Sequence, residues 1–312
     1  MPPPVAVIDL GSNSIKLLVA ASGVRGLPEA VYSRTLETRI SAGISQAHPR
    51  LAEEAMAQGL AAVRDLLDDA NRHGARRAVI VATSAVRDAA NGAEFRERVR
   101  QATGSTLRIL TGAEEANLIG RGLTCDPSLA GLRDFYVFDL GGGSLECLVF
   151  RDRRAVQEKS LPLGCVRLTE QCVRDPRKPF GRPEIEAVVK AVDASFAMSG
   201  FAFSLDTGAA VVGTGGTLTT ARAVLGVRTG QTVEQADPRL TTGQLRELRD
   251  GLGALPLPAR KEVLGLPPAR ADVFPTALAT LLAVADRGRF SSYRHSFYNL
   301  RWGLAAEELA KG

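Results

Sequence analysis

A ten-residue pattern occurs twice in this chain, and the repeat constrains the fold more than any other feature. The first copy, VIDLGSNSIK, begins at Val7, and the second, VFDLGGGSLE, begins at Val137. The two copies align without a gap at a separation of 130 residues. Each has an apolar run ending in aspartate, a glycine turn and a second apolar run, which is the pattern of a β-hairpin. The repeat predicts two similar domains that face each other across a cleft.

The turns of these hairpins have the composition of a phosphate-binding loop. Glycine lets the backbone bend and approach a ligand closely, because no Cβ intervenes. Turn amides and serine hydroxyls would then converge on one phosphate. Asp9 and Asp139 end the first strands, where a carboxylate would repel bound phosphate unless a hard cation such as Mg²⁺ lay between them. The hairpins therefore predict a phosphate site with magnesium, although a single Asp-x-Gly turn also occurs in hairpins without a function.

The rest of the first half predicts a mixed α/β order. Apolar residues alternate in strands and recur at helical spacing in helices, which predicts strands over residues 5–9, 15–20, 30–36, 78–82 and 107–110 and helices over 56–70 and 95–102. A further helix is expected over 111–123, with Thr111 as its N-cap. Glu114 and Glu115 fall in its first turn, where acidic residues also simply favour the helix dipole.

The second half carries more helix and a third glycine loop. Apolar stripes predict helices around 185–192 and 245–252, and residues 277–285 form a strongly apolar segment that we expect to be buried. Between them, an apolar strand runs into Gly213-Thr214-Gly215-Gly216 and then a helix. A loop at a helix N-terminus is a candidate anion site, although it is equally typical of a plain strand-to-helix turn.

Composition narrows the class of protein. A chain of 312 residues is long enough for two domains of ordinary size. No apolar run reaches the roughly 18 residues of a membrane span, and the start has no basic segment typical of a signal peptide, so a cytoplasmic protein is expected. The four cysteines show no CxxC spacing and are expected to be free thiols. The net charge of +5, mostly from arginine, suits a polyphosphate and equally a nucleotide.

Seven stretches, in order along the chain, resemble the signatures of the exopolyphosphatase and guanosine pentaphosphate phosphohydrolase (Ppx/GppA) family. They are Asp9–Ser14, Ala82–Asp88, Gly112–Ala116, Asp139–Glu146, Leu161–Leu168, Gly213–Thr217 and Arg270–Val273. The resemblance implies an α/β fold of two duplicated actin-like (ribonuclease H-like) domains around a cleft. We expect domains at residues 1–122 and 123–312, with a C-terminal helix at about 298–312 as a candidate to pack back on the first.

The resemblance also implies an activity and a set of site residues. Family members hydrolyse the terminal phosphoanhydride of inorganic polyphosphate, or of the stringent-response alarmone precursor guanosine pentaphosphate, with Mg²⁺ and a monovalent cation as a candidate activator. Glu115 would be the catalytic glutamate, and Asp139 and Glu146, with Asp9, would hold the metal. The predicted phosphate-binding residues are Gly11, Ser12, Asn13, Ser14, Lys16, Arg87, Gly141, Gly142, Gly143, Ser144, Gly213, Thr214, Gly215 and Gly216.

Other functions of the same fold stay open at this point. An ATP-dependent kinase would place adenosine near Gly213–Gly216, a non-catalytic sensor would bind (p)ppGpp or polyphosphate and signal through a partner, and an actin-type protein would form filaments. The carboxylates Glu115, Asp139 and Glu146 favour the hydrolase, since a sensor needs no group that activates water. We expect polyphosphate or guanosine pentaphosphate as the partner, no nucleic acid and no membrane, with a homodimer as a candidate assembly.

Overall fold

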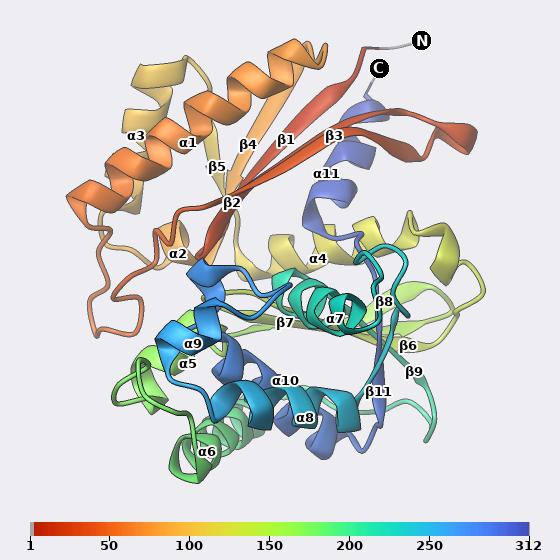
Figure 1. Ribbon diagram of the computed structural model, residues 1–312. Helices are drawn as coiled ribbons and strands as arrows, with labels where there is room; N and C mark the ends of the chain where they lie inside the picture. The colour runs from red at the N-terminus through yellow and green to blue at the C-terminus, as the bar shows by residue number, and fades with distance from the viewer. Residues whose placement is uncertain (1–2, 312) are drawn as a thin grey trace. The chain divides into compact units, whose positions relative to one another are not determined.

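A computed structural model describes residues 3–311, and the chain divides into two compact units (Figure 1). Unit 1 holds the residues up to Gly131 together with those from Tyr298 onward, and unit 2 holds Leu132–Phe297. The prediction of separate domains divided after residue 122 stays a prediction. No helix in the described part of the chain is long and apolar enough to cross a membrane. The four cysteines are free thiols.

Unit 1 is built on a five-stranded sheet with the strand order β3-β2-β1-β4-β5. The strands are β1 (Val5–Leu10), β2 (Ser14–Ser22), β3 (Pro28–Glu37), β4 (Arg77–Ala82) and β5 (Leu107–Ile109). The first three strands pair antiparallel, whereas β4 and β5 add parallel to β1. The helices are α1 (Glu53–Arg72), α2 (Ser84–Arg87), α3 (Gly92–Thr103), α4 (Gly112–Thr124) and α11 (Leu300–Leu309). The predicted strand and helix order is confirmed, and only the short α2 was not foreseen.

Helix α11 comes from the end of the sequence and packs on α4 and on the sheet of unit 1 (Figure 1). Two glycines allow the close approach of the helices. A Cβ added to Gly122 would lie 2.0 Å from the carbonyl oxygen of Asn299, and one added to Gly303 would lie 2.0 Å from that of Leu118. The two helix backbones are therefore in direct contact, which no larger residue at either position permits.

Unit 2 repeats the arrangement of unit 1. Its sheet has the order β8-β7-β6-β9-β11-β10, again with three antiparallel strands followed by two parallel additions, β9 and β11, while the edge strand β10 pairs antiparallel with β11. The strands are β6 (Phe135–Leu140), β7 (Leu145–Arg151), β8 (Arg154–Leu161), β9 (Ala210–Thr214), β10 (Arg239–Thr241) and β11 (Ser292–His295). Because β6 and β7 occupy the places of β1 and β2, the two repeated sequence patterns form equivalent hairpins. The predicted α/β fold of two duplicated actin-like units is confirmed.

The helices of unit 2 cover this sheet around α10, a helix whose first twelve residues are mostly apolar and all buried. They are α5 (Cys165–Cys172), α6 (Arg182–Ser199), α7 (Gly216–Arg228), α8 (Thr242–Gly253), α9 (Leu257–Lys261) and α10 (Phe274–Gly288). Every residue of α10 from Phe274 to Ala285 is buried, and the helix contacts α5, α6 and α8. A helix that is apolar on all sides can only lie inside a core. The predicted burial of 277–285 is confirmed.

Candidate active site

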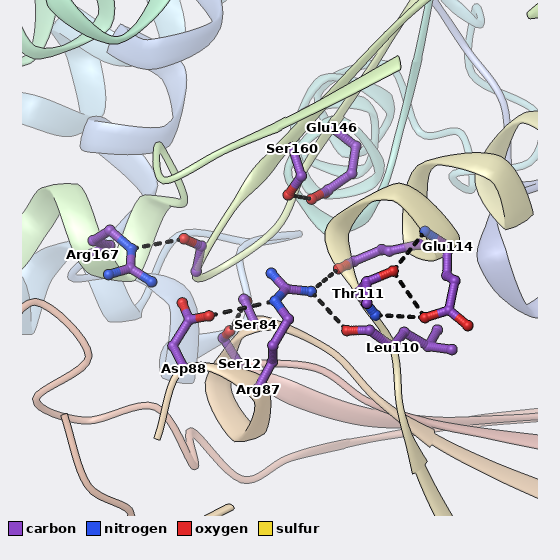
Figure 2. Close-up of polar contacts among 12 residues, drawn as sticks. Ser12, Ser84, Arg87, Asp88, Leu110, Thr111, Glu114, Glu146, Ser160 and Arg167 are labelled. Atoms are coloured by element: carbon purple, nitrogen blue, oxygen red, sulfur yellow. Dashed lines mark hydrogen bonds and ion pairs between the residues drawn. The ribbon is translucent and has the colours of Figure 1, made fainter. Parts of the chain in front are cut away.

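The loop of the first hairpin, between β1 and β2, is closed by its own backbone and held by α2. The amide of Gly11 donates to the carbonyl of Ser14 at 3.1 Å. The Ser12 and Ser84 hydroxyls lie 2.9 Å apart in a buried hydrogen bond (Figure 2). The Asn13 side chain donates to Glu37 at 2.7 Å and accepts from Arg39 at 3.2 Å. The loop is therefore rigid, and the amide group of Asn13 serves to hold the segment after β3.

Asp9 is the last acidic residue before this loop, and its Oδ1 atom is buried without a hydrogen-bond partner among the described residues. Lys16 lies directly opposite Asp9 in the β1–β2 register. Burial raises the pKa of Asp9, while the charges of Lys16 and Arg301 act in the opposite direction. A cation or an ordered water that contacts this carboxylate oxygen would stabilise the folded protein, because the oxygen would then have a partner.

Glu115 stands in the first turn of α4 and is 7% exposed. The preceding residue, Glu114, forms a capping box with Thr111, which fixes where the helix begins (Figure 2). Arg87, from the end of α2, donates to Glu115 Oε2 at 2.9 Å and to the Leu110 carbonyl at 3.1 Å. The two neighbouring glutamates thus have different surroundings. Glu114 caps the helix, whereas Glu115 is a buried carboxylate that accepts a hydrogen bond from Arg87.

The loop of the second hairpin is docked on the N-terminus of α5. The Gly141 carbonyl accepts from the Cys165 amide at 3.0 Å, and the Gly142 carbonyl accepts from the Val166 amide at 2.8 Å. The Gly143 carbonyl accepts from the Arg167 Nε atom at 2.9 Å (Figure 2). Three consecutive carbonyls therefore point toward α5.

This docking determines where the loop amides point. In a trans peptide the carbonyl of one residue and the N–H of the next point in opposite directions, and no peptide bond in the described chain is cis. The N–H groups of Gly142, Gly143 and Ser144 are therefore directed away from α5. Successive amides that point to one side form an anion-binding nest. The second hairpin consequently has the geometry of a phosphate cradle.

The two acidic residues of the second hairpin, Asp139 and Glu146, are directly opposite each other in the β6–β7 register, so both side chains project on one face of the sheet. Glu146 is buried, and its Oε1 atom accepts a hydrogen bond from Ser160 at 2.8 Å (Figure 2). In the first hairpin, the same register positions carry Asp9 and Lys16. Only the second hairpin therefore presents two carboxylates at the base of its loop.

The third glycine loop joins β9 to α7 beside the second hairpin. Asp139 is level with Thr214 in the parallel β6–β9 register. Gly215 has a φ of 87°, and a Cβ at this residue would lie 2.1 Å from Asp139 Oδ1. A Cβ on Gly216 would lie 2.4 Å from Arg270 Nη1. Glycine is needed at both positions because a Cβ would collide with a neighbouring side chain. The loop therefore lies against the Asp139 carboxylate and the Arg270 guanidinium.

The side chains of Arg222, His295 and Thr219 form a series of hydrogen bonds that ends at this loop. Arg222 donates to His295 Nδ1 at 3.3 Å, and His295 Nε2 lies 3.1 Å from Thr219 Oγ1. Since Arg222 can only donate, Nδ1 accepts and the neutral ring carries its proton on Nε2. Thr219 Oγ1 in turn donates to the Gly215 carbonyl at 2.9 Å. Burial, with the charge of Arg222, lowers the pKa of His295 to about 3, so the neutral ring persists at physiological pH.

Within each unit, the structure brings together some of the predicted residues. In unit 1, Ser12 is linked through Ser84 to α2, which also carries Arg87 and hence contacts Glu115. In unit 2, the Gly141–Ser144 loop, Asp139 with Glu146, and the Gly213–Gly216 loop lie side by side. The assigned roles of these residues stay predictions.

Sequence reasoning missed several residues of these loops. Arg167 and Arg270 lie within motifs that were recognised, Leu161–Leu168 and Arg270–Val273, but no role was drawn for either. Ser84 also lies within a recognised motif, Ala82–Asp88, whereas the chain from Arg222 to Thr219 had no signal beyond its residue types. Arginine in a recognised motif was the one usable signal, because its guanidinium group suits phosphate and carbonyl oxygens.

A duplicated unit of this topology, with a glycine hairpin in each copy, defines the class of actin-like folds. A sequence model of the Ppx/GppA phosphatase family matches residues 18–311, and the chain belongs to that family. The predicted family is thereby confirmed. A solved structure of the Aquifex aeolicus Ppx/GppA family member is similar, with a TM-score of 0.76, 25% sequence identity and 99% of each chain covered.

Two curated relatives have informative names. "Exopolyphosphatase 2" of Mycobacterium tuberculosis is 40% identical over 181 residues, which is 55% of this chain and 56% of that protein. "Guanosine-5'-triphosphate,3'-diphosphate pyrophosphatase" of Vibrio campbellii is 33% identical over 176 residues, which is 55% of this chain and 34% of that protein. The matches thus span about half of the first relative and about one third of the second.

Proposed function

We propose that this protein hydrolyses the terminal phosphoanhydride of inorganic polyphosphate, with guanosine pentaphosphate as a second candidate substrate. Water adds to the terminal phosphorus, the anhydride P–O bond breaks, and orthophosphate leaves. The observation that carries the proposal is the second hairpin loop, whose three carbonyls are held by α5 so that three amides form an anion nest. The names of the curated relatives support both substrates.

In this proposal Glu115 orients the attacking water and accepts its proton. A buried carboxylate held in one orientation by Arg87 is suited to this role, because a general base must be fixed within hydrogen-bond reach of the proton. The Arg87 guanidinium also lies 3.4 Å from Asp88, so it joins Glu115 and Asp88. The loops at Gly11–Ser14, Gly141–Ser144 and Gly213–Gly216, together with Lys16, would hold the phosphates.

The carboxylates fit a magnesium ion. No group of three or more His, Cys, Asp or Glu residues within 3–311 comes together as a metal site. Mg²⁺ commonly takes only one or two carboxylates and completes its shell with water and substrate phosphate, so Asp139 and Glu146 suffice as protein ligands. Asp9 lies in unit 1, and its role as a metal ligand stays a prediction. When bound, the ion would neutralise phosphate charge, with a monovalent cation as a candidate activator. A cytoplasmic location and a homodimer stay predictions.

Phosphate release, measured with Mg²⁺ on long-chain polyphosphate and on guanosine pentaphosphate side by side, tests the proposal. Release from polyphosphate establishes the exopolyphosphatase, and preference for the nucleotide assigns the alarmone phosphohydrolase. Release from neither, with tight binding of one, would replace the hydrolase by a sensor.

The neighbouring glutamates provide a matched pair of variants. Glu115→Gln should lower turnover by about 100-fold or more while substrate still binds, because general-base catalysis is lost. Glu114→Gln should be nearly neutral, since glutamine also completes a capping box. Equal activity of the two variants would refute the role of Glu115.

A further inference from the structure

Unit 2 contains a cavity of about 850 Å³ that none of the proposed catalytic groups lines. It opens where β9 and β11 begin, between residues 207–211, the start of β10 and the segment after α10. Strand β9 begins at this cavity and ends at the Gly213–Gly216 loop, so the two sites occupy opposite ends of one strand. Five residues of extended chain separate them by about 16 Å. The volume is within the range of small-molecule sites, which is about 300–1,000 Å³.

Three arginines and one aspartate line the cavity, which gives it a positive charge. Arg239 and Arg294 lie directly opposite each other in the antiparallel β10–β11 register. Like charges at such positions repel each other and destabilise the pair. The Asp237 carboxylate accepts from the Arg239 backbone amide at 2.8 Å, and Arg239 Nε donates to Ser292 at 3.3 Å.

The third arginine, Arg289, has an unfavourable backbone conformation. It caps α10 with φ 56° and ψ 42°, in the left-handed region where helices usually carry glycine. This conformation is unfavourable for a residue with a Cβ. Within residues 3–311, neither Arg289 nor Arg239 forms an ion pair with a carboxylate. Both side chains are exposed at the cavity with guanidinium groups available for an anion.

Part of the lining is apolar. Phe290 and Val211 line it together with Pro238. The Phe290 ring packs edge-on against Tyr293 at 5.1 Å and stacks with Phe138 at 5.8 Å, so aromatic neighbours hold its position. Apolar side chains do not stabilise a purely inorganic ion, because they neither solvate its charge nor donate a hydrogen bond. It suits the flat organic part of a ligand.

We propose that this cavity binds a nucleotide, with its phosphates at Arg239 and Arg289 and its base against Phe290 and Val211. Bidentate guanidinium contacts to phosphate oxygens are strong and directional, and the volume accommodates a base and sugar beyond them. The site is separate from the three glycine loops, so it adds a nucleotide-binding function to unit 2 that does not depend on the proposed hydrolysis.

Two substitutions, combined in one double variant, test the site at positions where the fold should tolerate them. Arg289→Gly removes a guanidinium at a position where glycine is the favoured residue, and Arg239→Gln changes an exposed side chain. Arg228→Gln is the matched control, because Arg228 is an exposed arginine of the same unit that does not line the cavity. Isothermal titration with GTP, ATP and inorganic tripolyphosphate in the presence of EDTA measures binding while metal-dependent turnover is suppressed.

The double variant should bind GTP and ATP at least about tenfold more weakly than wild type, since each lost charge-assisted contact accounts for about that factor. The control should bind as wild type does, and phosphate release should stay within twofold in both. Because all variants keep the glycine loops, a difference between them reports on this cavity alone. Photolabelling with 8-azido-ATP should mark the peptide that contains Phe290 in wild type and not in the double variant. Unchanged nucleotide binding in the double variant, or equally strong loss for tripolyphosphate, would overturn the proposal.

Discussion

Gly164 separates α5 from the second hairpin loop, and its replacement by alanine is a sensitive test of the proposed phosphate cradle. A Cβ at this position would lie 2.3 Å from the backbone atoms Gly142 C, Gly142 O and Gly143 C. Ordinary contact begins at 3.4 Å, so the loop would have to retreat by about 1 Å. Gly164 has φ −62° and ψ 150°, which alanine adopts without strain. The effect of the substitution is therefore purely steric and falls on the loop.

The consequence for activity should be much larger than the consequence for stability. Displacing a substrate-positioning group by about 1 Å costs about 100-fold in rate, whereas overpacking costs about 1–3 kcal/mol of folding free energy. We expect kcat/KM for polyphosphate to fall about 100-fold in Gly164→Ala, while circular dichroism shows a folded protein with a moderately lower Tm.

A second glycine provides the control. Gly251 is exposed in α8 with nothing near its added Cβ, so Gly251→Ala should retain activity and be slightly more stable. If Gly164→Ala kept activity within a few fold of wild type, the amides of the second loop would not be the phosphate cradle.

Three further predictions concern the supports of the site. Arg87→Ala should lower turnover and destabilise unit 1 by about 2 kcal/mol, because Glu115 loses a charge-assisted hydrogen bond while it stays buried. His295→Asn should abolish a loss of stability that the wild type shows as the pH falls. The folded-state pKa of about 3 lies below the ordinary value of 6.5, so the unfolded chain binds the proton first and stability falls by about 2 kcal/mol between pH 7 and pH 5. Gly122→Ala should destabilise unit 1 by about 3 kcal/mol, since its Cβ would meet the backbone of Asn299.

Each of these predictions has a measurement and a control. For Arg87→Ala, urea unfolding is compared with Arg108→Ala, which breaks only an exposed ion pair to Glu114 and should cost less than about 1 kcal/mol. An equal loss in both variants would contradict the buried role of Arg87. For His295→Asn, the free energy of unfolding is measured at pH 7 and pH 5 in the variant and in wild type. If both proteins lost the same stability between these pH values, His295 would not be the titrating group. For Gly122→Ala, a Tm equal to that of Gly251→Ala would show that α4 and α11 do not touch.

The sequence predicted the parts of the molecule that depend on local patterns. The two hairpins were visible because alternating apolar residues and glycine turns are properties of neighbouring residues, and the gapless repeat revealed the duplication. The capped start of α4 could be predicted because Thr111 and Glu114 interact over a single helical turn. The burial of α10 could be predicted from composition, because residues 277–285 are almost all apolar.

Only the tertiary structure decided which distant groups support the loops. Arg167 holds the Gly143 carbonyl, Arg270 lies against Gly216, and His295 reaches Gly215 through Thr219. The residues of the last pair are 80 positions apart, so no period or spacing in the sequence relates them. Whether Glu114 or Glu115 was the buried glutamate also depended on where Arg87 lay. Residue types and local periodicity determine which chemistry is available, but hydrogen bonds and close contacts depend on distances that arise only when the sheets and helices pack.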